Sequence, residues 1–487
     1  MCRNHRLCVS IGMASLLVLA AAAAPMLAQE ASPAGEAPRP SAPAQPTLSL
    51  DEAIALAMEH NPQVGAAEQG VELAKGNLLQ AVSYTHPRFE VSSSRTTPVD
   101  LPAFSFQSSG TSWETDFALS QPLYTGGALS KGIRAADDYL KGAAGAYQRT
   151  QQQIAFAVRQ AYYRVLTAGE QVKVSEEVVG SAEEHLRIAK LRYDAGVAPQ
   201  FDVLSAEAYV ARVEQGLIAA QTDLSIAREA LSTALGVQVS EDTRLTTPPA
   251  AEVPEVDPEA LKAEALAGRS DLLSAKAAVS AGAAVLGVAR GARQPTIAAA
   301  VSYALRPSTT IDGDLFGSPG TELVVSQNSG NIILVANWSL YNGGQVTGEI
   351  RAAQAQLRQA EKNLASLQLQ VGLDVKSAYL MLQSAAAQVK AAQKEVDQAR
   401  EAHRIAGLRY QEGVSTSVEV LDAEAGLEGA KTRLNSAIYG LNLAVASLDL
   451  AVGREWKPAS AQPAPLVSGA STPLGLALAR AQSRGGQ

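Results

Sequence analysis

The chain has 487 residues, with 38 glycines and 23 prolines but only 7 phenylalanines and 3 tryptophans, and its formal net charge is −8. This length exceeds that of one ordinary domain, and the shortage of large aromatic side chains disfavours a thick globular core. Much of the hydrophobic content is alanine, which favours long helices in close contact. The acidic balance argues against nucleic acid as a partner.

Residues 1–28 have the form of a secretory signal peptide. Basic residues precede an apolar run from Leu7 to Ala24, and the expected cut follows Ala28. An uncleaved N-terminal anchor is the alternative. Both cysteines, Cys2 and Cys8, lie in this segment, so the mature chain would contain no disulfide. No later run reaches the ~18 consecutive apolar residues of a membrane-spanning helix.

The remaining sequence divides into two repeats with linkers around them. Residues 29–47 are rich in proline and alanine and are expected to be disordered, as is most of the tail over 455–487. Prolines also mark a linker over 240–258. The first repeat is therefore expected over 48–239 and the second over 259–454.

A half-length helix is expected to open each repeat, over Leu50–Tyr84 and Ala260–Gln294, and two strands follow it. Apolar and polar residues alternate on the strands, as in the wall of a membrane β-barrel. A soluble hairpin packed on helices is the alternative. Four strands cannot close a barrel, and an open edge in lipid costs several kcal/mol per unpaired group, so several chains would share one barrel in contact with outer-membrane lipid. The strands are expected around Phe89–Ser94, Trp113–Leu119, Ile297–Leu305 and Ile332–Leu340.

Prolines and glycines mark the junctions between strands and helices. A proline precedes the first strand of each pair, and a pair of glycines follows the second strand. Glycine tolerates the positive φ that a sharp bend from strand to helix needs. The junction residues are Pro87, Gly126 and Gly127 in the first repeat and Pro295, Gly343 and Gly344 in the second.

Each repeat continues with an exceptionally long helix. No proline interrupts Gly127–Asp194 or Gly344–Glu412, and about 68 residues make a helix of roughly 100 Å. A seven-residue series of mostly apolar residues runs from Val158 to Tyr193, with a small residue three places after most members, and it returns from Val375 to Tyr410. Such a repeat predicts coiled-coil packing.

A short turn ends each long helix and starts a shorter return helix with its own seven-residue series, which predicts an antiparallel hairpin. The turns contain Gly196 and Val197 in the first repeat and Gly413 and Val414 in the second.

The two repeats align at an offset of 217 residues, which indicates a duplicated structural unit. Upstream the offset becomes 208, so the second repeat has an insertion, expected in a loop over Arg306–Gly330. The aligned segments include Leu123-Tyr124 with Leu340-Tyr341, and Leu191-Arg192-Tyr193 with Leu408-Arg409-Tyr410.

No catalytic, cofactor-binding or metal site is predicted. The five histidines show no metal-ligand spacing. The glycine pairs lack the lysine of a phosphate-binding loop. An enzyme is therefore not expected.

Over about residues 48–454 the sequence resembles the TolC-like outer-membrane efflux family. The motifs that carry the resemblance are Asn61-Pro62, Gln121–Gly127 with its counterpart Trp338–Gly344, and the hairpin segments Leu191–Val197 and Leu408–Val414. One departure is Ser270, which stands where the family usually has proline and is expected to alter a helix junction.

The resemblance implies a mainly α-helical fold with a membrane β-barrel: a homotrimer that shares a twelve-stranded barrel and extends a helical tunnel into the periplasm. It implies a passive exit channel, closed at its periplasmic tip until a periplasmic adaptor (membrane fusion) protein and an inner-membrane efflux pump or ABC exporter engage it. The tip glycines and valines are the expected adaptor contacts. A periplasmic or surface coiled-coil structural protein is the alternative function.

The resemblance also implies gate residues. The family closes its tip by bonds between hairpins, and the matching positions are Tyr410 and Asp202, with packing as the alternative role for Tyr410. Ser415 stands where some relatives have an arginine, so a weaker closure is expected. Glu419 and Asp422 fall in the first turns of a return helix, where threefold copies would attract cations. Helix capping is the alternative for Glu419.

Overall fold

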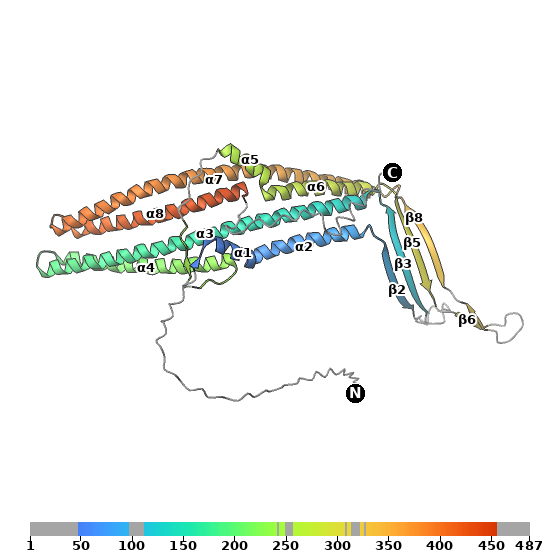
Figure 1. Cartoon of the computed structure of the whole chain (residues 1–487), viewed down its shortest axis with the longest axis horizontal. Coiled ribbons are helices and arrows are strands. Elements are labelled where there is room, and N and C mark those ends of the chain that lie inside the picture. The colour runs from blue at the N-terminus through green and yellow to red at the C-terminus, as the bar shows by residue number, and fades with distance from the viewer. Residues whose placement is uncertain are drawn as a thin grey trace, which may run out of the picture. The chain divides into compact units, whose positions relative to one another are not determined.

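The computed structural model describes residues 47–96, 112–240, 243–248, 257–306, 309–312, 322–325 and 328–454. The expected signal peptide and residues 455–487 lie outside these ranges, so their assignments stay predictions. Within the described ranges, both repeats have the predicted order of helices and strands (Figure 1). The helices are α1 (Leu50–His60), α2 (Pro62–Ser83), α3 (Ala128–Asp194) and α4 (Gln200–Leu235), then α5 (Pro258–Gly268), α6 (Ser270–Gly291), α7 (Gln345–Gln411) and α8 (Ser417–Val452).

The opening helix of each repeat is divided in two, which corrects the prediction of one continuous helix. Asn61 has an extended backbone (φ −71°, ψ 122°), because the residue before a proline is disfavoured in the helical region, and its side chain caps α2. Arg269 breaks the second repeat at the equivalent place (φ −62°, ψ 128°), although Ser270 replaces the proline. The junction therefore persists without proline.

Equivalent contacts hold the two breaks. Asn61 Nδ2 donates to Ala234 O at 2.8 Å, at the end of α4. Arg269 Nη1 donates to Ala451 O at 3.1 Å, at the end of α8. Arg269 is 2% exposed and also pairs with Asp271 and Asp374, at 2.6 and 3.0 Å. An ionic network around the buried Arg269 in the second repeat thus takes the place of one side-chain hydrogen bond in the first.

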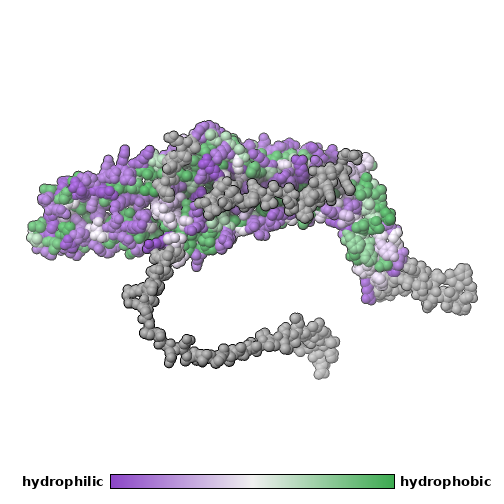
Figure 2. Space-filling model, in the orientation of Figure 1, coloured by the Kyte–Doolittle hydropathy of each residue, from purple (hydrophilic) through white to green (hydrophobic). Residues whose placement is uncertain are grey.

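The four predicted strands are present, and they form one antiparallel sheet in the order β2-β3-β5-β8. Its register places Phe117 opposite Tyr303 and Val301 opposite Ile332. Within the described part of the chain, β2 and β8 each have one edge without a partner strand. Hydrophobic side chains gather over this sheet (Figure 2), and Ile332 is 86% exposed. The strands are β2 (Arg88–Thr96), β3 (Ser112–Tyr124), β5 (Thr296–Leu305) and β8 (Ser329–Asn337).

Two predicted loop or linker segments contain short ladders. In the segment expected as a loop, β6 (Thr309–Asp312) pairs with β7 (Glu322–Val325). Where linkers were expected over 29–47 and 240–258, β1 (Thr47–Leu48) pairs in parallel with β4 (Arg244–Leu245). The buried Tyr162 hydroxyl fixes this second ladder to α3, because it lies 2.9 Å from Leu48 O and 2.7 Å from Thr246 O and can donate its single proton to either.

The junction glycines adopt the backbone that the sequence predicts. Gly126, Gly127, Gly343 and Gly344 have φ values of 60°, 79°, 65° and 93°. Pro87 and Pro295 directly precede β2 and β5.

The long helices follow the predicted heptads along only part of their length. In α7 the positions Val375, Leu382 and Val396 are buried. In α3 the early positions are buried too, but Tyr193 is 44% exposed and Val174 and Val178 are buried instead. A straight helix drifts relative to a 7-residue repeat, so one face cannot stay buried along a helix of this length.

One described helix, α6, is long and apolar enough to cross a membrane by length and mean hydropathy alone, although Asp271 and Lys276 interrupt its apolar residues. Leu272 of α6 belongs to the core shared with α7 and α8, and Leu286 packs with Ile350 of α7. These contacts make α6 a packed helix of the bundle.

Candidate gate at the hairpin tips

Two turns of the same type form the tips of the helical hairpins. Gly196 and Gly413 have φ values of 75° and 76°, and the next residue in each turn bonds back to the long helix. Val197 N donates to Arg192 O and Val414 N to Arg409 O, both at 2.9 Å. This pattern is a glycine-terminated helix end. It leaves Val197 and Val414 exposed by 66% and 67%.

Four side chains join the first hairpin to the second just behind the tips: His185 and Arg192 of α3, Tyr410 of α7 and Ser417 of α8. We call them the inter-hairpin cluster. His185 Nε2 lies 2.7 Å from Ser417 Oγ, and both residues are buried. Arg192 Nη1 donates to Tyr410 O at 2.6 Å, and its guanidinium carbon lies 4.7 Å from the centroid of the Tyr410 ring. The cluster combines charge-assisted hydrogen bonding with a cation–π contact.

Apolar packing continues behind the cluster. Leu421 of α8 packs with Val174, Val178 and Tyr209 of the first hairpin. Because apolar contacts have no strict direction while the cluster's hydrogen bonds do, the cluster fixes how the two hairpins align.

Asp202, a predicted partner of Tyr410, makes no side-chain hydrogen bond to it. The buried Tyr410 hydroxyl faces Ser417 without a hydrogen bond of normal geometry. Burial raises the pKa of Tyr410, and the negative charge of Asp202 raises it further. Burial lowers the pKa of His185, whereas Asp202 raises it. Asp202 therefore acts on the cluster through its charge.

Glu419 has partners within its own hairpin. Ser415 Oγ donates to Glu419 Oε2 at 2.8 Å, and Arg409 Nη1 lies 3.6 Å from the same oxygen. Thr416 begins α8 without a side-chain cap, so the alternative of a capping box is not formed. Asp422 is exposed and has no side-chain partner among the described residues.

A buried carboxyl lies beside the cluster. Glu424 is 5% exposed, and its Oε2 lies 4.0 Å from His403 Nε2. Burial raises the pKa of Glu424, while the hydrogen bond from Ser181 and the charge of His403 lower it.

Sequence reasoning missed His185, Arg192 and Ser417. One signal was present for His185, because the aligned position of the second repeat is Ala402. Such a departure from the repeat pattern marks a site where one copy has a separate role. The contact between His185 and Ser417 could be found only from the structure, because it depends on how the two hairpins align.

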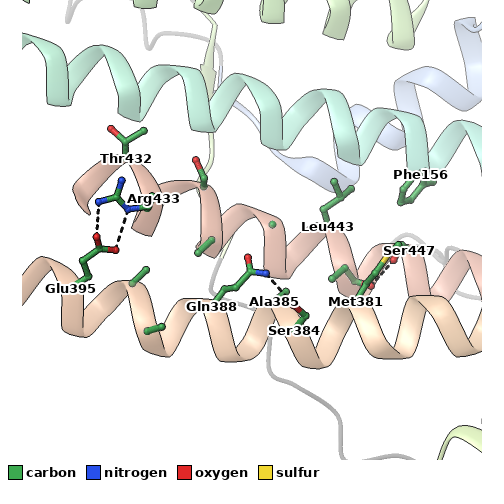
Figure 3. A pocket seen from close by; sticks show the side chains of 16 residues that line it. Phe156, Met381, Ser384, Ala385, Gln388, Glu395, Thr432, Arg433, Leu443 and Ser447 are labelled. Atoms are coloured by element: carbon green, nitrogen blue, oxygen red, sulfur yellow. Dashed lines mark hydrogen bonds and ion pairs between the residues drawn. The ribbon is translucent and has the colours of Figure 1, made fainter. Parts of the chain in front are cut away.

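A cavity of 730 Å³ between α7 and α8 offers no comparable chemistry (Figure 3). Its charged residues, Arg433 and Glu395, are paired with each other, and Gln388 donates to Ser384. Among the residues that the structure describes, no group of three His, Cys, Asp or Glu could hold a metal ion.

A sheet with open edges, continued by two 67-residue helices that end in exposed turns, defines a subunit of a membrane channel with a long helical extension. The family model described as outer membrane efflux protein matches residues 53–237 and 261–454. The chain belongs to this family.

Individual relatives agree with this assignment. The outer membrane efflux protein BepC of Brucella suis is 26% identical over 417 residues, which cover 83% of this chain and 85% of BepC. The crystal structure of CusC superposes with a TM-score of 0.71 at 20% identity, covering 83% of this chain and 92% of CusC. The CmeC channel of Campylobacter jejuni gives a TM-score of 0.70 at 18% identity, covering 85% and 87%. These two structures support the fold alone.

The chain is thus an outer-membrane efflux channel of the kind found in tripartite or type I secretion systems, with a periplasmic helical extension. Channels of this family are not enzymes, which agrees with the prediction. Family membership implies a trimer that works with efflux partners.

Proposed function

We propose that the inter-hairpin cluster keeps the periplasmic tip of this exit channel closed. The observation that carries the proposal is the bond from Arg192 to Tyr410 O, because it links the two hairpins of one chain next to their turns. Opening requires the hairpins to separate, which breaks this bond and the His185–Ser417 contact. A hydrogen bond to a charged group is worth about 1.5–3 kcal/mol, so its loss shifts the closed-to-open ratio by roughly tenfold or more.

Glu419 and Asp422, the two acidic residues nearest the start of α8, have different proposed roles. Asp422 is exposed and unpaired among the described residues, so three copies would form a carboxylate ring that attracts cations. The charge of Glu419 is partly offset by Arg409, so it contributes less to this attraction.

The proposed partners are a periplasmic adaptor protein and an inner-membrane efflux pump or ABC exporter. The adaptor would contact the exposed apolar residues of the tips, which include Val197 and Val414. An adaptor bound at the tips would lie next to the inter-hairpin cluster, where it could separate the hairpins and open the channel.

Passive entry of a large antibiotic into cells tests the gate. Cells with Arg192→Gln should become more sensitive than cells with wild-type protein at equal trimer levels. The matched control is Arg187→Gln, five residues earlier on α3, because Arg187 is exposed and its one ion-pair partner among the described residues is Glu184 on its own helix. Equal sensitivity of both variants would refute the proposed gate.

Adaptor contact requires a separate measurement. Val197→Asp with Val414→Asp should abolish efflux in cells while the isolated trimer still conducts ions. Ile226→Asp, at a 53% exposed position of α4, is the control for a charge on an exposed apolar site. Normal efflux by the tip variant would contradict the assigned contact.

A further inference from the structure

A second cavity, of 480 Å³, lies where the N-terminus of α3 meets the C-terminus of α6. This end of the bundle adjoins the sheet, because β3 ends at Tyr124 and β5 begins at Thr296. Gly126 permits the close approach of the two repeats. A Cβ atom there would lie 2.6 Å from both Gln294 Cβ and Gly291 O.

Three cationic side chains line this cavity: Lys131 and Arg134 near the start of α3, and Arg290 in the last turn of α6. None of them has a side-chain partner among the described residues. The aliphatic part of Lys131 lies against Gly287, where an added Cβ would be 3.1 Å from Lys131 Cγ. Packing therefore positions an ammonium group at the cavity without an acidic partner.

The acidic group one helical turn after Arg134, Asp138, already has partners. Asp138 is 5% exposed, accepts a hydrogen bond from Ser280 at 2.5 Å and pairs with Lys141 at 3.3 Å. Because Asp138 is occupied by these partners, the cavity keeps an excess of positive charge.

An exposed apolar and aromatic belt lies next to the cavity. Trp338 Nε1 donates to Arg293 O at 3.1 Å, three residues beyond Arg290, and its side chain is 61% exposed. Leu123 and Tyr124, at the end of β3, are 60% and 45% exposed. Tryptophan and tyrosine gather at the level of lipid head groups in membrane proteins. The cations therefore lie at the periplasmic boundary of the membrane.

We propose that this cavity binds the phosphate group of an anionic phospholipid in the periplasmic leaflet of the outer membrane. Lys131, Arg134 and Arg290 donate to the phosphate oxygens, and the acyl chains lie along the apolar belt. Free phosphate would meet the same cations but would gain nothing from Leu123 and Tyr124. The junction of the two repeats thereby anchors the channel in its membrane.

Lipid binding to the purified full-chain trimer tests the proposal, with dioleoyl phosphatidylglycerol as probe and dioleoyl phosphatidylcholine as its neutral counterpart, both measured by native mass spectrometry. Lys131→Gln with Arg134→Gln should weaken phosphatidylglycerol binding by roughly 10- to 30-fold. The matched control, Arg351→Gln with Arg358→Gln, removes two exposed cations from α7 that do not line the cavity. It should bind as the wild type does.

Equal phosphatidylglycerol binding by the two double variants would overturn the proposal. If sodium phosphate displaced phosphatidylglycerol at the same concentration as the lipid itself, the site would be one for free anions, and the lipid assignment would be wrong. Should the cavity variant fail to assemble, Arg290→Gln alone must still weaken phosphatidylglycerol binding. Unchanged binding in that variant would also overturn the proposal.

Discussion

Arg192 and Arg409 occupy equivalent positions of the two repeats but bind to different partners. Arg409 lies 3.6 Å from Glu419 within its own hairpin, whereas Arg192 donates to Tyr410 O of the other hairpin. The residue aligned with Glu419 is Asp202, and Arg192 forms no ion pair with it in the described structure. The two repeats therefore have similar turns, but only the first has an arginine that donates a hydrogen bond to the other hairpin in the described structure.

The pH should control closure through His185. Burial lowers its pKa below the ordinary 6.5, Asp202 raises it, and His403 lowers it. Because the unfolded or separated state binds a proton more readily, the closed state is fully stable above pH 6.5 and loses stability as the pH falls through the lowered pKa. Single-channel conductance should therefore increase on acidification, and His185→Asn should flatten this dependence.

Glu424 opposes this effect. Burial raises its pKa above 4.5, so its contribution to stability is complete below pH 4.5 and is lost as the pH rises through the raised pKa. Glu424→Gln should leave the acid-induced rise in conductance intact, which separates the two groups. Loss of the rise in this variant, with the rise preserved in His185→Asn, would exclude His185 as the sensor.

Ion selectivity should depend more on Asp422 than on Glu419. Asp422→Asn removes three unpaired charges from a trimer, whereas Glu419→Gln removes charges that Arg409 already offsets in part. The measurement is the reversal potential of the trimer across a salt gradient. A larger shift for Glu419→Gln would show that the Arg409 pair does not persist in the assembled channel.

The breaks between the short helices should differ in stability. Arg269→Ala leaves Asp271 and Asp374 without their buried partner and should lower the free energy of unfolding by about 2 kcal/mol or more. Asn61→Ala loses one side-chain hydrogen bond and a helix cap and should lower it by about 1–2 kcal/mol. Urea unfolding of the trimer, followed by helical circular dichroism, compares the two variants. Equal unfolding midpoints for the two variants would mean that the ionic network at Arg269 stabilises its junction no more than the hydrogen bond of Asn61 stabilises the other.

The long elements could be predicted from sequence because their signals are strong and local. The proline-free stretches predicted the ends of α3 and α7 to within one or two residues, and Gly126 and Gly343 marked the bends before them. The duplication added independent support, because each signal occurs twice. The function as an exit channel was predicted from the family resemblance, because the local patterns predict helices and strands and do not identify what they transport.

Other features depend on contacts between distant residues. The residue pattern alone predicted one helix through Asn61, because a proline at the first position of a helix starts a helix as readily as it interrupts one. Only the family resemblance placed Asn61-Pro62 after an opening helix. Tyr193 was placed in a core series but is exposed, since heptads cannot follow one face along 67 residues. His185 and Ser417 are separated by 232 residues, so only the alignment of two hairpins brings them together.

The central claim is that contacts between the hairpins hold the channel closed, and single-channel conductance in planar bilayers tests it most directly. We expect purified Arg192→Gln trimers to show a larger mean conductance than the wild type, with the open fraction raised roughly tenfold, while Arg187→Gln trimers match the wild type. Identical conductance for all three proteins, with intact trimers, would contradict the claim.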